Sequence, residues 1–227
     1  MPSPKKSNSL TAYPKAARIA FFPVLTLIFI LWMLYRSLFA FPVWFDESIG
    51  KALFFGVPVW LFVTMTRNKA IVDSFAPGRL YKGLLLGVAI GGVFGFVAAI
   101  LSVFSKGTLL QATPLFVAPE FWGEFVLAIC TAFWETLVFY SFAMTMIREK
   151  YPKWSLSRQA VLTSSIFVLF HIPNAFLRFE IGAVSGVLFL LFLFALGQAY
   201  LFAARKNAYA LVLSHTIWGL VLLSYGW

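Results

Sequence analysis

The chain has 227 residues, of which 61% are hydrophobic and only 11% are charged, with a formal net charge of +10. A soluble domain of this length could not bury so much apolar surface, so the composition excludes that class. Runs of about 20 mostly apolar residues recur along the chain and predict helices that cross a membrane, whereas the alternating strands of an outer-membrane barrel are absent. We therefore expect an all-α fold, a polytopic transmembrane helical bundle.

The sequence divides into a short tail and one transmembrane domain. Residues 1–18 are basic and rich in Ser and Pro, which predicts a disordered cytoplasmic tail. Residues 19–227 form the membrane domain, and its seven expected spans cover 19–35, 52–66, 83–104, 122–147, 159–175, 181–204 and 208–225. The segment 36–51 is expected to be an interfacial loop or surface helix around Trp44, and an eighth, short membrane helix is the alternative there.

Lysine and arginine alternate between high and low numbers in the segments between these spans. Fourteen of the eighteen lie in the tail and in 67–82, 148–158 and 205–206, and the other four are Arg36, Lys51, Lys106 and Arg178. Cytoplasmic loops carry an excess of basic residues, so the pattern predicts a multi-pass protein of the cell membrane with its N-terminus inside. The positive charge is therefore explained by the orientation of the protein in the membrane. We expect the lipid bilayer as its partner and no nucleic acid.

The third expected span carries a glycine at every fourth position, at Gly83, Gly87, Gly91 and Gly95. This spacing places the four on one helix face, where small residues let a neighbouring helix approach closely. We expect the face to pack within one subunit, and a homodimer interface is the alternative.

Three ionisable residues, Glu135, His171 and His215, stand inside apolar stretches, and the two histidines are the only ones in the chain. Glu135 and His171 lie thirteen residues to either side of the basic loop 148–158, roughly 20 Å into the membrane at the helical rise. His215 is nine residues beyond Lys206, or about 14 Å in. The three groups therefore share a depth, and we expect them to converge.

Ionisable groups in hydrocarbon are costly and usually mark a function. A carboxylate and two imidazoles suffice for general acid and base chemistry, and they are also an acceptable zinc set. A protonated Glu and interior histidines that only satisfy hydrogen bonds are the structural alternative. A proton-coupled transporter is a further hypothesis, and the lack of an internal repeat counts against it.

Three short motifs surround these residues. The stretch Glu135–Phe142, ETLVFYSF, is similar to a family motif E-E-x-x-x-R; Phe167–His171 matches F-x-x-x-H; and His215–Gly219 matches H-x-x-x-N in part. In order and spacing they resemble the CPBP family, which comprises the CAAX-protease and bacteriocin-processing (Abi-type) intramembrane proteases. The resemblance covers about residues 120–225.

This resemblance implies an intramembrane endopeptidase that cleaves a membrane-embedded or lipid-anchored peptide. Glu135 and His171 would bind and activate the attacking water, and His215 would help stabilise the oxyanion. A glutamate mechanism without a cofactor is the expectation, and zinc held by the same three residues is the alternative.

The chain departs from the family motifs at three positions. Thr136 and Tyr140 replace the second Glu and the Arg, and we expect them to supply hydrogen bonds in place of an ion pair. Gly219 replaces the Asn, whose loss removes an oxyanion donor, and Asn174 or Thr216 are the candidates to substitute for it. A catalytically inactive scaffold or partner-binding protein is therefore the alternative function.

Overall fold

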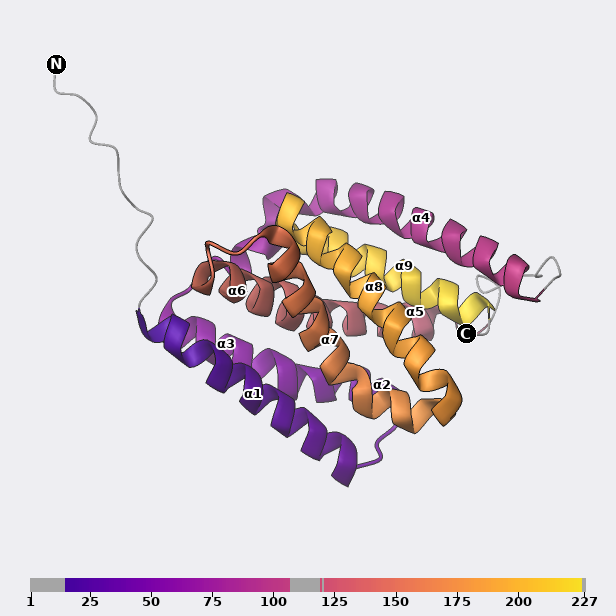
Figure 1. The fold of residues 1–227 in the computed structure, drawn as a ribbon, viewed down its shortest axis with the longest axis horizontal. Helices are drawn as coiled ribbons and strands as arrows, with labels where there is room; N and C mark the ends of the chain where they lie inside the picture. Colours follow the sequence, from indigo (N-terminus) through magenta and orange to yellow (C-terminus); the bar gives the residue numbers. More distant parts are fainter. Residues whose placement is uncertain (1–14, 107–118, 120, 226–227) are drawn as a thin grey trace, which may run out of the picture.

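The computed structural model describes residues 15–106, 119 and 121–225, and within these ranges every regular element is a helix (Figure 1). The elements in chain order are α1 (Lys15–Leu38), α2 (Val43–Phe45), η1 (Asp46–Gly50), η2 (Ala52–Gly56), α3 (Val57–Thr66), η3 (Val72–Phe75), η4 (Pro77–Arg79), α4 (Leu80–Lys106), α5 (Phe121–Glu135), η6 (Thr136–Met144), α6 (Thr145–Lys150), α7 (Leu156–Arg178), α8 (Ile181–Arg205) and α9 (Ala208–Tyr225). Most of the expected tail lies outside the described residues, and its last four residues already belong to α1.

The all-helical membrane fold is confirmed. Six stretches of the described chain are long and apolar enough to cross a bilayer: Ala17–Leu38, Val43–Thr66, Pro77–Val97, Phe121–Lys150, Leu156–Leu177 and Ile181–Arg205. The seventh expected span coincides with α9, where the apolar helix Ala208–Val221 is shorter than the other six. The expected spans, about seven, therefore correspond to six long apolar helices and the shorter α9 in the described part of the chain.

The second span begins much earlier than the sequence suggests. The elements α2, η1, η2 and α3 follow one another without a break and form a single helical stretch, Val43–Thr66. In η1 and η2 the helix is π-helical, with hydrogen bonds from residue i to i+5. The segment 36–51 is thus neither a surface loop nor a separate eighth helix, because most of it is the first half of this span.

The charged residues of that segment explain the error. Glu47 and Lys51 are 8% and 3% exposed, and Asp46 is equally buried. Charges lower the mean hydropathy of a window, and an unpaired charge in hydrocarbon is costly, so the sequence favours a surface position. The fold instead pairs each of these charges inside the bundle, as described below for the site.

The helix formed by α5, η6 and α6 runs through the middle of the bundle, with α1 and α3 on one side and α8 and α9 on the other (Figure 1). Its central segment is fully buried from Val138 to Met144. Phe139 lies within 4.9–6.0 Å, ring centre to ring centre, of Phe55, Phe167 and Phe170. These aromatic contacts fix the helix that carries Glu135 against the second span and α7.

The glycine stripe packs α4 along α9 of the same chain. A Cβ added at Gly87 would lie 2.7 Å from the Cβ of Leu213, and one at Gly91 would lie 2.6 Å from Cδ1 of Ile217. The other two glycines of the stripe meet residues at the two ends of α9. The two helices approach closely because these side chains are missing, and α9 covers the face that a second copy of the chain would need.

We predict that Gly87→Leu lowers the free energy of unfolding in detergent by about 1–3 kcal/mol, because the new side chain overpacks the contact with α9. Gly92→Leu is the matched control, since a Cβ there has no atom within 4 Å, and it should change stability by less than about 0.5 kcal/mol. Equal unfolding temperatures for the two variants would contradict the packing of α4 on α9.

Candidate active site

The structure brings the three ionisable residues of the sequence analysis to one point. Glu135 is the last residue of α5 and is 3% exposed. His171 on α7 places its Nε2 3.5 Å from Oε1 of Glu135, and His215 on α9 places its Nε2 3.6 Å from Oε2. The shared depth that the sequence predicts for these three side chains therefore corresponds to three helices that meet at one carboxylate.

Glu135 stands where the α-helix changes to the π-helical segment η6. Such segments often accompany functional sites, and they change which residues share a helix face. The hydroxyl of Tyr140 donates to the carbonyl of Ala195 on α8 at 3.4 Å, and the buried hydroxyl of Thr136 has no partner among the described residues. Of the hydrogen bonds that were expected from these two side chains, the described residues contain the one from Tyr140, and it is made to α8.

A buried lysine completes the site, and the sequence analysis missed it. Lys51 of the second span is 3% exposed, and its Nζ lies 2.5 Å from Oε1 of Glu135. The same ammonium contacts Glu47, whose Oε2 also accepts a hydrogen bond of 2.9 Å from Thr131. Two carboxylates thus share one ammonium group inside the bundle. The available signal was the spacing of Glu47 and Lys51, which are i and i+4 on a helix and can pair there.

The ring of His171 is held in one orientation. Its Nδ1 lies 2.8 Å from the carbonyl oxygen of Phe167, and its ring stacks on the Phe167 ring at 4.1 Å. A carbonyl oxygen only accepts, so Nδ1 carries a proton and Nε2 is the nitrogen that faces Glu135. The distance of 3.5 Å from Nε2 to the carboxylate is longer than a typical direct hydrogen bond.

The site also contains polar atoms that no protein group satisfies. Oε2 of Glu135 and Nδ1 of His215 are buried and have no hydrogen-bond partner among the described residues. Buried polar atoms are nearly always paired, so such atoms call for an explanation. Together with Nε2 of His171, these atoms can still form hydrogen bonds with a small polar group.

A cavity of about 710 Å³ lies over these atoms. Glu135, Lys51 and both histidines line it, and Asn174 and Gly219 lie further along its wall. Oδ1 of Asn174 accepts from Nε of Arg36 at 3.0 Å, so the amide NH₂ of Asn174 is not used in that contact. Thr216, the other candidate donor, bonds its own helix at the carbonyl of Val212. At Gly219 an added Cβ would have no atom within 4 Å.

Zinc held by Glu135, His171 and His215 is the alternative to a reaction without a cofactor, and both stay predictions. In the described part of the chain, no group of three or more His, Cys, Asp or Glu side chains is placed to bind one ion. The carboxylate that would be a ligand is instead bound by the ammonium of Lys51, and a divalent cation at the same oxygen would be repelled by that charge.

Residues 117–221 match the family model described as type II CAAX prenyl endopeptidase Rce1-like. This part of the chain is similar to the Rce1-like family, and we call it the Rce1-like domain. The match agrees with the CPBP motifs, and at the level of the family it supports an endopeptidase within a multi-pass membrane protein. Comparisons with curated proteins and with solved structures give no significant match.

The Rce1-like domain contains Glu135 and both histidines, but Lys51 and Glu47 lie outside it. The second span therefore contributes the cation of the site from a part of the chain that the family model does not cover. No motif of the domain could have identified this residue, since its contact with Glu135 joins positions 84 residues apart.

We predict that Lys51→Met lowers the free energy of unfolding by about 3–5 kcal/mol, because it leaves two buried carboxylates without their shared cation. The loss should be smaller when Glu135→Gln is already present, as measured by a double-mutant cycle of unfolding in detergent. Lys153→Met, at an exposed lysine of the α6–α7 loop, is the control and should be nearly neutral. Additive losses would show that Lys51 and Glu135 do not interact.

Proposed function

We propose that this protein is an intramembrane endopeptidase that hydrolyses a peptide bond with a water molecule activated by Glu135 and His171. The observation that carries the proposal is the convergence of Glu135, His171 and His215 on one cavity wall within an Rce1-like domain. The substrate we propose is a membrane-embedded or lipid-anchored peptide, because the cavity lies among membrane-spanning helices.

The water would be held by two acceptors. In the neutral form of His171, Nε2 has a lone pair, and Oε2 of Glu135 has no hydrogen-bond partner among the described residues, so each can accept one O–H of the same molecule. Oε2 then takes a proton while the water oxygen attacks the carbonyl carbon of the scissile bond. The fixed ring of His171 holds the water in place, which lowers the entropic cost of the attack.

The attack puts a negative charge on the carbonyl oxygen of the substrate. His215 and the ammonium of Lys51 are the nearest groups to Glu135 that can donate to it, and the amide of Asn174 is available on the same wall. When the carbon–nitrogen bond breaks, the proton on Glu135 passes to the leaving nitrogen. The products are a carboxylic acid, which still carries the second proton of the water, and an amine; transfer of that proton between them gives a carboxylate and an ammonium ion, and the carboxylate of Glu135 is restored.

We propose that the reaction needs no metal ion. The support is the ion pair between Lys51 and Glu135, because the ammonium supplies the positive charge that a metal would otherwise bring to this oxygen. Metal chelation before the assay should leave turnover unchanged in this mechanism, whereas a zinc-dependent mechanism would lose it.

We predict that Glu135→Gln lowers turnover at least about 10²-fold, because an amide cannot accept the proton of the attacking water. The measurement compares new peptide termini, by mass spectrometry, in membranes of cells that express either the wild type or the variant at equal abundance. Termini present only with the wild type would identify the substrate in the same experiment.

Glu180→Gln is the matched control, since this exposed glutamate lies before α8 and outside the cavity. It should give the wild-type termini. Identical termini for wild type and Glu135→Gln, with both proteins folded, would refute the protease and favour the inactive scaffold.

A second prediction concerns the missing donor. Gly219→Asn should raise turnover by about 10-fold or more, because the cavity has room for the side chain and one oxyanion donor is typically worth 10²–10³ in rate. Gly219→Leu has a similar volume but no donor, so it should not raise turnover. Equal rates for the two variants would show that the new amide does not reach the oxyanion.

A further inference from the structure

The active-site cavity extends from Glu135 toward one end of the bundle only. On α5 its lining residues lie between Glu135 and the start of the helix, and on α7 they run from Phe167 to just beyond the end. On the second span they are the early residues, at and before Lys51. The further lining residues are, on α5, Thr131, Ala128, Leu127 and Glu124; on and after α7, Asn174, Ala175 and Phe179; and on the second span, Glu47, Trp44 and Val43.

Exposure of the lining side chains rises along this path. Lys51 and Glu135 are each 3% exposed at its inner end. Phe179 is 39% exposed and Trp44 is 58% exposed at the other end, where Glu124 is also exposed. The cavity is therefore closed in the middle of the bundle and open at the end where α5 begins and α7 ends.

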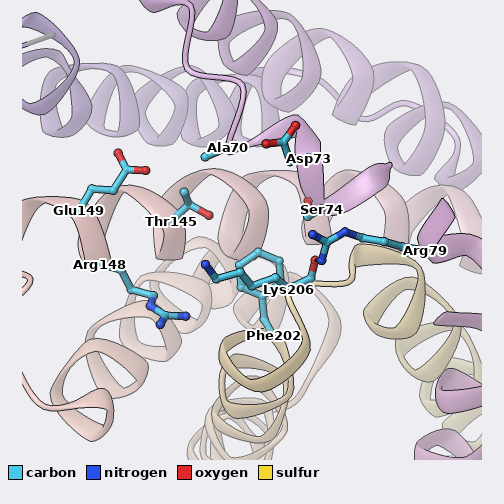
Figure 2. A pocket seen from close by; sticks show the side chains of 9 residues that line it. All are labelled: Ala70, Asp73, Ser74, Arg79, Thr145, Arg148, Glu149, Phe202 and Lys206. Carbon is cyan, nitrogen blue, oxygen red and sulfur yellow. The ribbon is translucent and has the colours of Figure 1, made fainter. Parts of the chain in front are cut away.

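The opposite end of the bundle gathers the basic segments. Nζ of Lys150 donates to the carbonyl of Arg18 at 2.7 Å, which joins the start of α1 to the end of α6. A guanidinium nitrogen of Arg79 donates to the carbonyl of Lys206 at 2.6 Å, which joins the start of α4 to the α8–α9 connection. Figure 2 shows this end, where Arg79, Arg148 and Lys206 surround a small pocket together with Asp73 and Glu149.

The cavity end carries little positive charge by comparison. Of the four basic residues that the sequence places on this side, Arg36 is paired with Asp46, and Lys51 is part of the buried cluster at Glu135. The other two, Lys106 and Arg178, are the last residues of α4 and α7. Fourteen basic residues on the other side thus stand against four on this side.

We propose that the cavity opens to the extracytoplasmic side of the membrane, and that its substrate presents the scissile bond there. Basic loops stay in the cytoplasm during insertion, so the end opposite to them faces outward. The substrate class is then a membrane-proximal peptide segment on the outer face, rather than a lipid-modified tail in the cytoplasm. The statement about substrate rests on the proposed peptidase function, whereas the orientation of the cavity does not.

The test uses cysteine labelling, since Cys130 is the chain's single cysteine and can be replaced by Ser. Glu124→Cys reports the mouth of the cavity, and Lys153→Cys reports the basic loop. In intact cells, a membrane-impermeant maleimide should label Glu124→Cys roughly tenfold more than Lys153→Cys. Permeabilising the cells should bring Lys153→Cys to a similar level. Trp44→Cys is a second mouth position if Glu124→Cys does not accumulate.

Labelling of Lys153→Cys but not of the mouth positions in intact cells would overturn the proposal, because the cavity would then face the cytoplasm. Mouth positions that remain unlabelled after permeabilisation would also overturn it, because the cavity would be closed at that end. The measurement needs no turnover. An unchanged set of peptide termini in Glu135→Gln would therefore refute the peptidase and leave the orientation standing.

Discussion

The buried ion cluster of Lys51, Glu135 and Glu47 is the interaction on which the rest of this site depends. A single charge in the middle of the bundle would be costly, and the ammonium makes the carboxylate of Glu135 tolerable there by direct contact. The contact also ties the second span to the central helix. Both histidines are then placed around a carboxylate whose position is fixed, and one of its oxygens has no hydrogen-bond partner among the described residues. A site that binds a polar reactant inside hydrocarbon needs this combination of a paired charge and a remaining unpaired atom.

The cation of the site comes from a place that the motifs do not contain. In the motif that the central helix resembles, a second Glu and an Arg stand on the same helix as the first Glu, whereas this chain has Thr136 and Tyr140 at those positions. Here the positive charge arrives from another span, 84 residues earlier in the sequence. The carboxylate of Glu135 is still paired, because a cation from a neighbouring helix takes the place of the Arg that the motif would supply. The altered motif alone is therefore not evidence that the site is inactive.

The two ends of the bundle differ, and the difference determines from which end the cavity at Glu135 can be reached. Hydrogen bonds between connections hold the basic end together, and the cavity reaches only the other end. In the proposed reaction, the water would reach Glu135 through this cavity, from one side of the membrane. The close packing of α4 on α9 through the glycine stripe keeps His215 in line with the other two groups, because α9 carries that residue. Helix packing far from the chemistry thus contributes to its geometry.

The sequence by itself determined the membrane class, the helical fold, the approximate spans and the three residues that meet. Apolar runs, basic loops and the depth of an ionisable residue along a helix are local properties, and they survive any rearrangement of the helices. Only the tertiary structure decided that Lys51 and Glu47 lie inside, that η6 is π-helical, and that Tyr140 bonds to α8. A charge in hydrocarbon is stable only beside an opposite charge. A hydropathy average covers a single segment of the sequence, so it contains no information about an opposite charge on another helix. The direction in which the cavity opens is also a property of how several helices diverge, and no single segment encodes it.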